Sequence, residues 1–322
     1  MSYKVGVDLG GTKILVALAH EGGGIMASRK FPTEALEGPD RVLRRLVEVA
    51  GELLFSEGLS WHKVDGIGIC MAGFIDKRSA TIVSSPNLPG WEGFPLEREL
   101  KKRLKIPVLV ENDASAAAYG EFLYGAGKGK RNLVNITLGT GIGGGIIAEG
   151  QIYRGSGGFA GEIGHLILLP DGPPCGCGKK GCLEALSSGL AIAREGRLFL
   201  ESGGGGILRE IAGGEDEKLT AAHVFEAARK GDKGALKIIE RAAFFLGLAL
   251  SHVVNILNPE IITLSGGLAQ SGELFFSKIR RYLHEAAVLP SAEMVSLVPA
   301  LLGEEAGVIG ILALLEQYLK EL

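Results

Sequence analysis

Two stretches of this chain follow the same plan. Residues 5–16 read V-G-V-D-L-G-G-T-K-I-L-V, and residues 134–147 read V-N-I-T-L-G-T-G-I-G-G-G-I-I. Each stretch is an apolar strand, a glycine turn and a second apolar strand. A valine, a leucine and the first turn glycine coincide when one stretch is laid over the other. Self-similarity of this kind indicates a repeated structural unit, so the sequence predicts two copies of one domain plan.

Elsewhere the apolar residues alternate between the spacing of strands and that of helices, which predicts a mixed α/β fold. The expected strands are 3–9, 13–20, 25–30, 64–71, 107–111, 260–265 and 294–298, and the expected helices are 39–57, 95–104, 114–124 and 304–320. The apolar run Ala242–Leu257 is short for a membrane span and carries polar residues, so it is expected to be a core helix. The glycine-rich segments 203–206 and 211–218 are expected to be exposed loops.

Length and composition argue against several classes of protein. The 322 residues suffice for two domains or one large domain, and the 46% hydrophobic content allows a sizeable core. The net charge is −3 with no basic block, which argues against a nucleic-acid binder. The chain opens M-S-Y-K-V-G-V-D without a signal peptide, so we expect a cytoplasmic protein with no membrane anchor.

Three of the four cysteines gather in one segment. E-I-G-H begins at Glu162, and C-G-C-G-K-K-G-C-L-E runs from Cys175 to Glu184. One nitrogen and three sulfurs, a usual donor set for tetrahedral zinc, come from His165, Cys175, Cys177 and Cys182. The alternatives are a disulfide or free thiols, and a reducing cytoplasm disfavours the disulfide. Zinc here would fix the flanking acids Glu162 and Glu184 as scaffolding for a polar small-molecule site.

Both glycine turns have the character of phosphate-binding loops. In D-L-G-G-T-K, Asp8–Lys13, the turn exposes backbone N–H groups beside a threonine hydroxyl, and Asp8 could reach Mg²⁺ through water. The alternative is an ordinary hairpin turn with a polar tip. Residues 138–145 also fit a dinucleotide-binding pattern, but the expected next element is a strand, which disfavours a nicotinamide site. The turn S-G-G-L at 265–268 would allow close approach of a flat ring or a phosphate.

The motif E-N-D at 111–113 stands where an expected strand runs into a helix. Asn112 and Asp113 are residue types that cap helices, and this structural role alone would explain them. A carboxylate at this junction could also accept a proton from a hydroxyl group as it attacks a phosphorus atom. We expect the helix N-terminus to keep this carboxylate ionised.

Taken in order, these motifs resemble the ROK family of sugar kinases and repressors. The set is D-L-G-G-T-K, E-N-D-A, L-G-T-G-I-G-G-G, E-I-G-H with C-G-C-G-K-K-G-C-L-E, and S-G-G, and it covers essentially the whole chain. The resemblance implies an actin-like, ribonuclease-H-like α/β fold of two lobes with a cleft between them. It implies transfer of the ATP γ-phosphoryl group to a hexose 6-hydroxyl with Mg²⁺. Residues 1–120 with a helix at about 304–322 would form the small lobe, and 121–303 the large lobe with the zinc site.

The same resemblance assigns roles to individual residues. Asp113 would be the catalytic base, and the zinc would be structural. The sugar-binding residues would be Gly73, Asn87, Asn112, Asp113, Glu162, His165 and Glu184. The nucleotide-binding residues would be Asp8, Gly10, Gly11, Thr12, Lys13, Gly139, Thr140, Gly141 and Gly143 on the phosphates, with Gly266 and Gly267 on the adenosine. His165 would serve twice, with one ring nitrogen on zinc and the other toward the sugar.

The resemblance also ranks the candidate sugars and argues against other classes of protein. N-L-P-G-W at 87–91 resembles the glucokinases of the family, which favours glucose over mannose, fructose, N-acetylglucosamine and N-acetylmannosamine. ROK repressors carry a winged helix-turn-helix before the kinase-like domain, and a first strand at Tyr3 is expected to leave no room for one. A non-catalytic sugar sensor would not need Asp113, and a structural zinc module would not need two phosphate loops. A homodimer or homotetramer is expected from the family.

Overall fold

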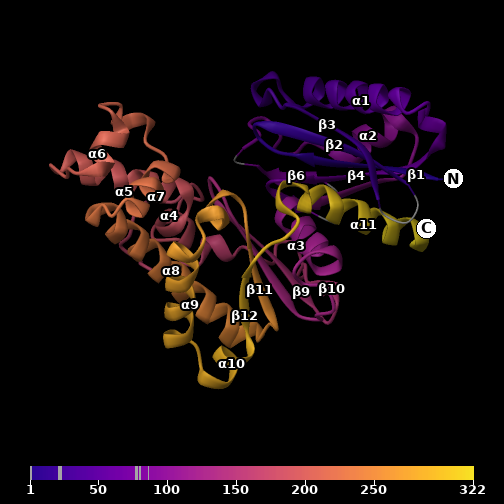
Figure 1. Cartoon of the computed structure of the whole chain (residues 1–322). Coiled ribbons are helices and arrows are strands. Elements are labelled where there is room, and N and C mark those ends of the chain that lie inside the picture. Colours follow the sequence, from indigo (N-terminus) through magenta and orange to yellow (C-terminus); the bar gives the residue numbers. More distant parts are fainter. Residues whose placement is uncertain (1, 21–23, 77–78, 80, 86) are drawn as a thin grey trace. The chain divides into compact units, whose positions relative to one another are not determined.

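The structure, a computed structural model, describes residues 2–20, 24–76, 79, 81–85 and 87–322 (Figure 1). These residues form two compact units. The first unit comprises Met1–Gly129, Gly145–Gly161 and Leu302–Leu322, and the second comprises Lys130–Gly144 and Glu162–Leu301. Residues 121–303 were expected to form one lobe, whereas residues 121–129, 145–161 and 302–303 group with the first unit.

The first unit is built on a five-stranded sheet in the order β3-β2-β1-β4-β7. Its strands are β1 (Tyr3–Leu9), β2 (Lys13–His20), β3 (Ile25–Pro32), β4 (Val64–Met71) and β7 (Val108–Asn112). β2 is antiparallel to β1 and β3, whereas β1, β4 and β7 are parallel. Leu9 pairs with Met71, which in turn pairs with Asn112. The three parallel strands therefore end at one edge, the usual place for a ligand in such sheets.

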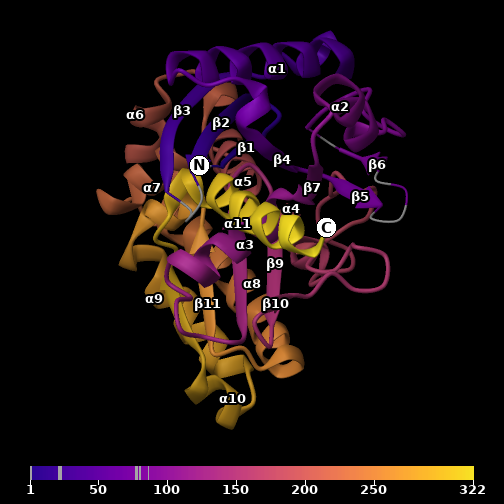
Figure 2. The same ribbon diagram turned by 90° about the vertical axis from the view of Figure 1, so that its right-hand side faces the viewer.

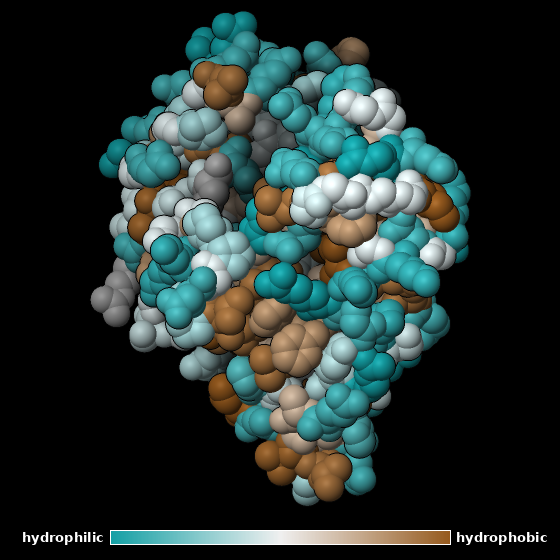
Figure 3. Space-filling view, turned by 90° about the vertical axis from the view of Figure 1, so that its left-hand side faces the viewer, coloured by the Kyte–Doolittle hydropathy of each residue, from teal (hydrophilic) through white to brown (hydrophobic). Residues whose placement is uncertain are grey.

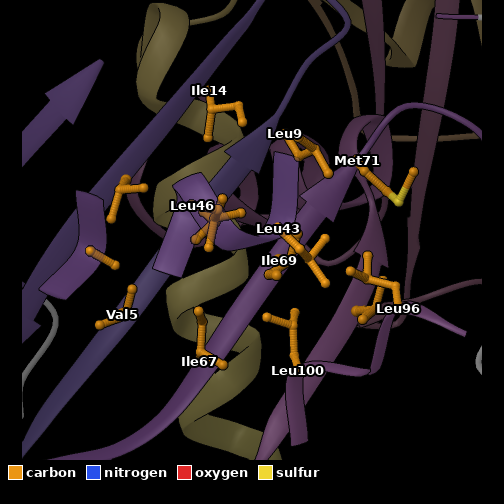
Figure 4. Packing of buried hydrophobic residues seen from close by; sticks show 14 of the residues in the cluster. Val5, Leu9, Ile14, Leu43, Leu46, Ile67, Ile69, Met71, Leu96 and Leu100 are labelled. Carbon is orange, nitrogen blue, oxygen red and sulfur yellow. The ribbon is translucent and has the colours of Figure 1, made fainter. Parts of the chain in front are cut away.

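A hydrophobic core covers one face of this sheet. Two helices, α1 (Pro39–Ser56) and α2 (Leu96–Leu104), pack there, and Figure 4 shows their apolar side chains meeting those of β1 and β4. The fully buried residues of these helices include Leu43, Leu46, Leu96 and Leu100. Successive strand residues point to opposite faces, so every second residue of β1 reaches this core. Each buried leucine stabilises the fold by about 1.5–3 kcal/mol.

Two helices cover the opposite face of the sheet. They are α3 (Asp113–Tyr124) and α11 (Ala306–Glu321), which lie side by side in Figures 1 and 2. A Cβ atom added to Gly310 of α11 would lie 1.8 Å from the carbonyl oxygen of Ala116 in α3. Only glycine allows this approach, so a helix from the end of the chain packs directly on the helix that begins at Asp113.

Smaller elements complete the first unit. They are the hairpin of β5 (Phe74–Asp76) and β6 (Thr81–Ser84), strand β10 (Gln151–Ile152), and the 3-10 helices Ala35–Glu37, Trp61–Lys63 and Gly303–Glu305. The hairpin was not expected from the sequence. It follows Gly73 directly, so it lies at the edge of the sheet where the parallel strands end.

A second five-stranded sheet has the order β10-β9-β8-β11-β12. Its remaining strands are β8 (Leu133–Leu138), β9 (Ile142–Ala148), β11 (Ile261–Ser265) and β12 (Ser296–Pro299). The chain passes from the second unit to the first within β9. β8, β11 and β12 are parallel, and Ser265 pairs with Thr137. The glycine turns that follow β8 and β11 therefore leave the sheet at the same edge.

Helices make up most of the second unit. They are α4 (Leu183–Ser187), α5 (Gly189–Glu201), α6 (Ile207–Ala212), α7 (Ala221–Arg229), α8 (Lys233–Leu257), α9 (Glu273–Ala286) and α10 (Leu289–Met294), with 3-10 helices at Ile163–His165, Asp216–Lys218 and Gly267–Ser271. Among the described residues, α8 is the one helix long and apolar enough to cross a membrane, but 61% of its most apolar 18-residue stretch is buried. It packs against α4, α7 and α9, as expected for a core helix. Figure 3 shows polar residues interspersed among the apolar patches on the face it draws.

The expectation of an exposed loop at 211–218 is wrong in part. The segment 203–206 is a loop, but α6 runs to Ala212 and a short 3-10 helix follows at Asp216–Lys218. Asp232 explains the helix, because its Oδ2 accepts a hydrogen bond from Leu208 N at 3.0 Å. This partner lies far along the sequence, so the local glycines gave no sign of it.

Candidate active site

Asn112 and Asp113 begin α3 at the edge where the parallel strands of the first sheet end. The side chain of Asn112 is the N-cap: Oδ1 accepts from Ser115 N at 3.0 Å, and Nδ2 donates to the carbonyl oxygen of Gly73 at 3.2 Å. Asp113 Oδ1 accepts from Ala114 N at 2.8 Å. Asn112 therefore fills the expected capping role, and the same side chain brings the loop at Gly73 to the start of the helix.

Burial and the backbone N–H groups at the start of α3 act on the pKa of Asp113 in opposite directions. Burial raises the pKa of the Asp113 carboxyl above its ordinary range, and hydrogen bonds from backbone N–H groups lower it only in part. The backbone N–H groups at the start of α3 favour the ionised form, but loss of hydration outweighs them, so the net shift of the pKa is upward. A raised pKa makes a carboxylate a stronger base toward the proton of a hydroxyl group.

A second carboxylate, Asp8, stands beside it at the end of β1. Burial and the repulsion of Asp113 raise the pKa of Asp8 to about 7, whereas a hydrogen bond from Cys70 and the charge of Lys13 oppose the rise. Cys70, expected to be a plain core thiol, is indeed buried. Its hydrogen bond with Asp8 also places it next to the site. Two mutually repelling carboxylates form an arrangement that a divalent cation would relieve, so the oxygens of Asp8 fit the expected contact with Mg²⁺.

The raised pKa of Asp8 predicts a pH-dependent stability. Between about pH 4 and pH 7 the folded protein binds the Asp8 proton more tightly than the unfolded chain, so the free energy of unfolding falls as pH rises. Asp8→Asn removes this cost. We expect the variant to unfold at a higher temperature than the wild type at pH 8 without added Mg²⁺, and at nearly the same temperature at pH 4. Thermal melts at the two pH values measure this, and equal melting temperatures at pH 8 would count against it.

The first glycine turn is held from two sides. Gly10 N donates to the carbonyl oxygen of Lys13 at 3.1 Å, and Thr33 Oγ1 donates to that of Gly10 at 2.6 Å. A Cβ atom added to Gly11 would lie 2.7 Å from the Cβ of Asn87. The segment that carries Asn87 therefore packs directly on the turn, which brings together an expected phosphate loop and an expected sugar contact.

Basic side chains stand next to this turn. Lys13 Nζ lies 3.0 Å from Glu304 Oε1, and Lys30 Nζ lies 2.6 Å from Glu304 Oε2. The two ammonium groups lower the pKa of Glu304 to about 2. Thr12 is exposed at the tip of the turn. Neither Lys30 nor Glu304 was recognised from the sequence, because the three charged groups meet only when β2, β3 and the 3-10 helix Gly303–Glu305 fold together.

In the second unit, the four expected metal ligands converge. Their donor atoms all lie within 4.8 Å of one another, with 3.7 Å between Cys177 Sγ and Cys182 Sγ and 3.6 Å between Cys175 Sγ and His165 Nδ1. A tetrahedral zinc with bonds of about 2.3 Å to sulfur places its ligands about 3.7 Å apart, so the set fits zinc. The thiols are free rather than joined in disulfides. The second ring nitrogen of His165, Nε2, lies 3.9 Å from Glu162 Oε2.

Glycines shape the loop that carries these ligands. Gly181 has a φ of +68°, and a Cβ atom there would lie 1.5 Å from the carbonyl oxygen of Leu169. The backbone of Gly181 also accepts a hydrogen bond from Leu168 N at 2.9 Å. The loop therefore folds back on itself as expected, because no side chain stands between its two limbs.

Glu184 joins the zinc loop to the second glycine turn. Its Oε2 accepts a hydrogen bond from Ile142 N at 2.9 Å, and its Oε1 lies 3.6 Å from Cys175 Sγ. A Cβ atom added to Gly141 would lie 2.3 Å from the same Oε2, so a glycine is needed there. This contact was not expected, since the sequence separates the two segments by some forty residues. Glu184 thus orders the turn as well as being an expected sugar ligand.

The second and third glycine segments line one cavity of about 630 Å³ within the second unit. Gly139 and Gly267 belong to its lining, together with Leu190 and Phe225. A Cβ atom added to Gly266 would lie 2.4 Å from the carbonyl oxygen of Leu138, so β8 and the turn after β11 touch. The next element after the G-T-G-I-G-G turn is a strand, β9, as the sequence predicted. Helices α5 and α7 also contribute to the cavity, which no sequence motif had indicated.

The expected site residues divide between the two units. The first unit carries Asp8, Gly10, Gly11, Thr12, Lys13, Gly73, Asn87, Asn112 and Asp113. The second carries Gly139, Thr140, Gly141, Gly143, Glu162, His165, Cys175, Cys177, Cys182, Glu184, Gly266 and Gly267. Within each unit these residues gather at the sheet edge where the parallel strands end or on the zinc loop.

Known proteins match this chain over nearly its full length. A glucokinase of Halalkalibacterium halodurans is 38% identical over 96% of this chain and 93% of its own. A glucokinase of Thermotoga maritima is 37% identical over 97% of each chain. A solved structure, the ROK family glucokinase of Streptomyces griseus in complex with glucose and AMPPNP, is 34% identical and has a TM-score of 0.83, covering 98% of this chain and all of that one.

These likenesses establish the fold as the two-lobed, actin-like fold of the ROK sugar kinases. The ROK family profile itself matches residues 4–318. The chain therefore belongs to the ROK family.

Proposed function

We propose that this chain is a glucokinase that transfers the γ-phosphoryl group of ATP to the 6-hydroxyl of glucose. The relatives named glucokinase, which match nearly the whole chain, support the reaction and the sugar. The observation that carries the chemistry is Asp113, a carboxylate with a raised pKa at the first turn of α3 beside Asp8. Phosphoryl transfer needs positioning, charge stabilisation and a residue that orients the attacking hydroxyl, and these groups supply such a set.

Asp113 accepts the proton of the 6-hydroxyl as that oxygen attacks the γ-phosphorus atom in line. Asn112 binds neighbouring hydroxyls of the sugar, and its bond to Gly73 holds the loop that takes part in the same contact. Asn87 contributes from the segment packed on the first glycine turn. Buried polar groups of this kind reject an epimer because a misplaced hydroxyl leaves them unpaired.

Residues of the second unit hold the other end of the sugar. Glu162, His165 and Glu184 bind near the 1- and 2-hydroxyls in this proposal. The metal site orients the histidine ring for this contact, because Nδ1 faces the cysteine sulfurs while Nε2 lies beside Glu162. Zinc bound to four protein ligands has no open position, so it would order the loop and take no part in the chemistry.

The nucleotide occupies the glycine-rich segments. The cavity of the second unit takes the adenosine, since apolar side chains such as Leu190 and Phe225 can pack on a flat ring. The turns Gly10–Lys13 and Gly139–Gly143 bind phosphate oxygens through backbone N–H groups, and Lys13 adds charge. Mg²⁺ bound with the nucleotide would neutralise charge on the β- and γ-phosphates, with Asp8 as its expected protein contact. We also propose that the enzyme works in a reducing cytoplasm as a homodimer or homotetramer.

Initial rates with a panel of hexoses test this proposal. We expect ATP-dependent turnover with glucose to exceed that with mannose, fructose, N-acetylglucosamine and N-acetylmannosamine in kcat/KM. The matched control is 6-deoxyglucose, which keeps the ring hydroxyls but lacks the acceptor, so it should inhibit without being phosphorylated. Preference for another hexose would keep the reaction and change the substrate. Binding of glucose without turnover of any sugar would favour a sugar sensor instead.

A further inference from the structure

Glu111 is a buried carboxylate next to the site, and the mechanism above does not use it. Its side chain is 2% exposed at the end of β7. A buried carboxylate is costly unless charge and hydrogen bonds compensate it. Arg154 supplies both, because its Nε and Nη2 each lie 2.9 Å from Glu111 Oε2. The other oxygen, Oε1, accepts a hydrogen bond from Asn112 N at 3.0 Å. Arg154 thus holds one oxygen while the second holds the backbone beside Asp113.

Arg154 opens a short loop that closes on itself. The backbone N–H of Ala160 donates to the carbonyl oxygen of Arg154 at 3.1 Å, which encloses the G-S-G-G tip at 155–158. Phe159, just before the closing bond, packs against Phe74 in an edge-to-face arrangement with ring centroids 5.9 Å apart. The loop is therefore fixed at two places, by a charge pair at its start and by an aromatic contact at its end.

These contacts form a closed ring of interactions that leads back to the E-N-D motif at residues 111–113. Phe74 follows Gly73, and the carbonyl oxygen of Gly73 accepts the hydrogen bond from Asn112 Nδ2 at 3.2 Å. From Asn112 the ring continues through Glu111 to Arg154 and back to the loop. All of these residues belong to the first unit. Asn112 is held by its main chain through Glu111 and by its side chain through Gly73.

We propose that Glu111 and Arg154 are a positioning pair for the phosphoryl transfer, which clamps segment 154–160 against the end of β7 and thereby orients Asn112 and Asp113. The inference rests on the proposed function, because that function gives Asp113 its role. Stability alone gives a carboxylate in this buried position little purpose, since replacing buried charges with apolar residues is often neutral or stabilising. Orientation does give it one, because a small displacement of a catalytic group can cost about a hundredfold in rate.

Arg154→Met tests the pair, with Arg29→Met as the matched control. Arg29 belongs to the same unit, is 41% exposed against 38% for Arg154, and pairs with Glu52 at 2.7 Å. We expect Arg154→Met to lower kcat for glucose at least about tenfold with little change in KM for ATP. Arg154→Lys should recover part of the loss by keeping the charge, and Arg29→Met should keep wild-type kcat. A kcat within about twofold of wild type in Arg154→Met would overturn the proposal.

A second variant keeps the test decisive if Arg154→Met does not fold. Phe159 is 41% exposed, so Phe159→Ala removes the other fixed point of the loop at little cost in stability. A several-fold lower kcat in this variant supports the clamp, and an unchanged kcat overturns it. If the wild type phosphorylates no glucose, the proposed function fails, and amide hydrogen exchange then tests the clamp by itself. Faster exchange over 155–161 in Arg154→Met but not in Arg29→Met supports the clamp, and equal exchange in the two variants overturns it.

Discussion

Asp113→Asn is expected to lower kcat for glucose phosphorylation about a thousandfold, because positioned general acid–base groups contribute roughly 10²–10⁴ in rate. The amide keeps the shape of the side chain and an oxygen that can accept from Ala114 N, so the start of α3 should stay intact. KM for glucose should change much less than kcat, since the lost interaction is with a proton that is transferred only in the transition state. Steady-state kinetics over glucose and ATP concentrations measure the separation.

The wild type should also lose kcat as pH falls, because protonation of Asp113 removes the base. Burial raises the pKa of this carboxyl, so the loss should begin at a higher pH than for an ordinary aspartate. Asp65→Asn, an exposed aspartate in the same unit, is the control and should keep both rate and profile. A variant at position 113 with a tenth or more of the wild-type kcat would contradict the role of base.

Cys177→Ser is expected to abolish stoichiometric zinc binding and to weaken glucose binding about ten- to a hundredfold, by analogy with the loss of metal affinity or activity when groups around a metal site are changed. Cys177 is exposed, so the substitution should leave the core packed and act through the metal. Without zinc the loop no longer holds His165 beside Glu162, nor Glu184 against Ile142 N. Metal analysis and calorimetric titration with glucose measure the two effects.

Lys179→Ser serves as the control for this experiment. Lys179 is exposed in the same loop and its side chain is no ligand, so zinc content and glucose affinity should both stay at wild-type values. Full glucose affinity in zinc-free Cys177→Ser would show that the metal and the sugar site are independent, which contradicts the coupling through Glu184 and His165.

The elements and motifs that local sequence determines were predicted well. β1, β2 and β4 begin and end where the apolar pattern placed them, because turn glycines and polar residues bound each strand. The zinc ligands could be identified because their spacing in the chain is short, and the structure brings their donor atoms together. Asn112 could be recognised as a cap because such caps act on the backbone only three residues ahead.

Features set by distant partners could not be predicted in this way. Three contacts join segments that lie more than twenty residues apart in the chain. They are those of Glu111 with Arg154, of Glu184 with Ile142 and of Asp232 with Leu208 in α6. The hairpin after Gly73 is another case, since its short strands carry little periodic signal. The upward shift in the pKa of Asp113 was not predicted either, because it depends on how much water the folded chain excludes, which no local pattern records.

Phosphorus NMR of the products formed from ATP, Mg²⁺ and glucose shows whether this chain phosphorylates glucose and at which hydroxyl. We expect the wild type to form glucose 6-phosphate and ADP in equal amounts, and Asp113→Asn to form almost none while still binding glucose. A phosphoester at another hydroxyl would contradict the assigned position of transfer. Absence of any phosphoester in a zinc-loaded protein that binds both glucose and ATP would contradict the claim that this chain is a glucokinase.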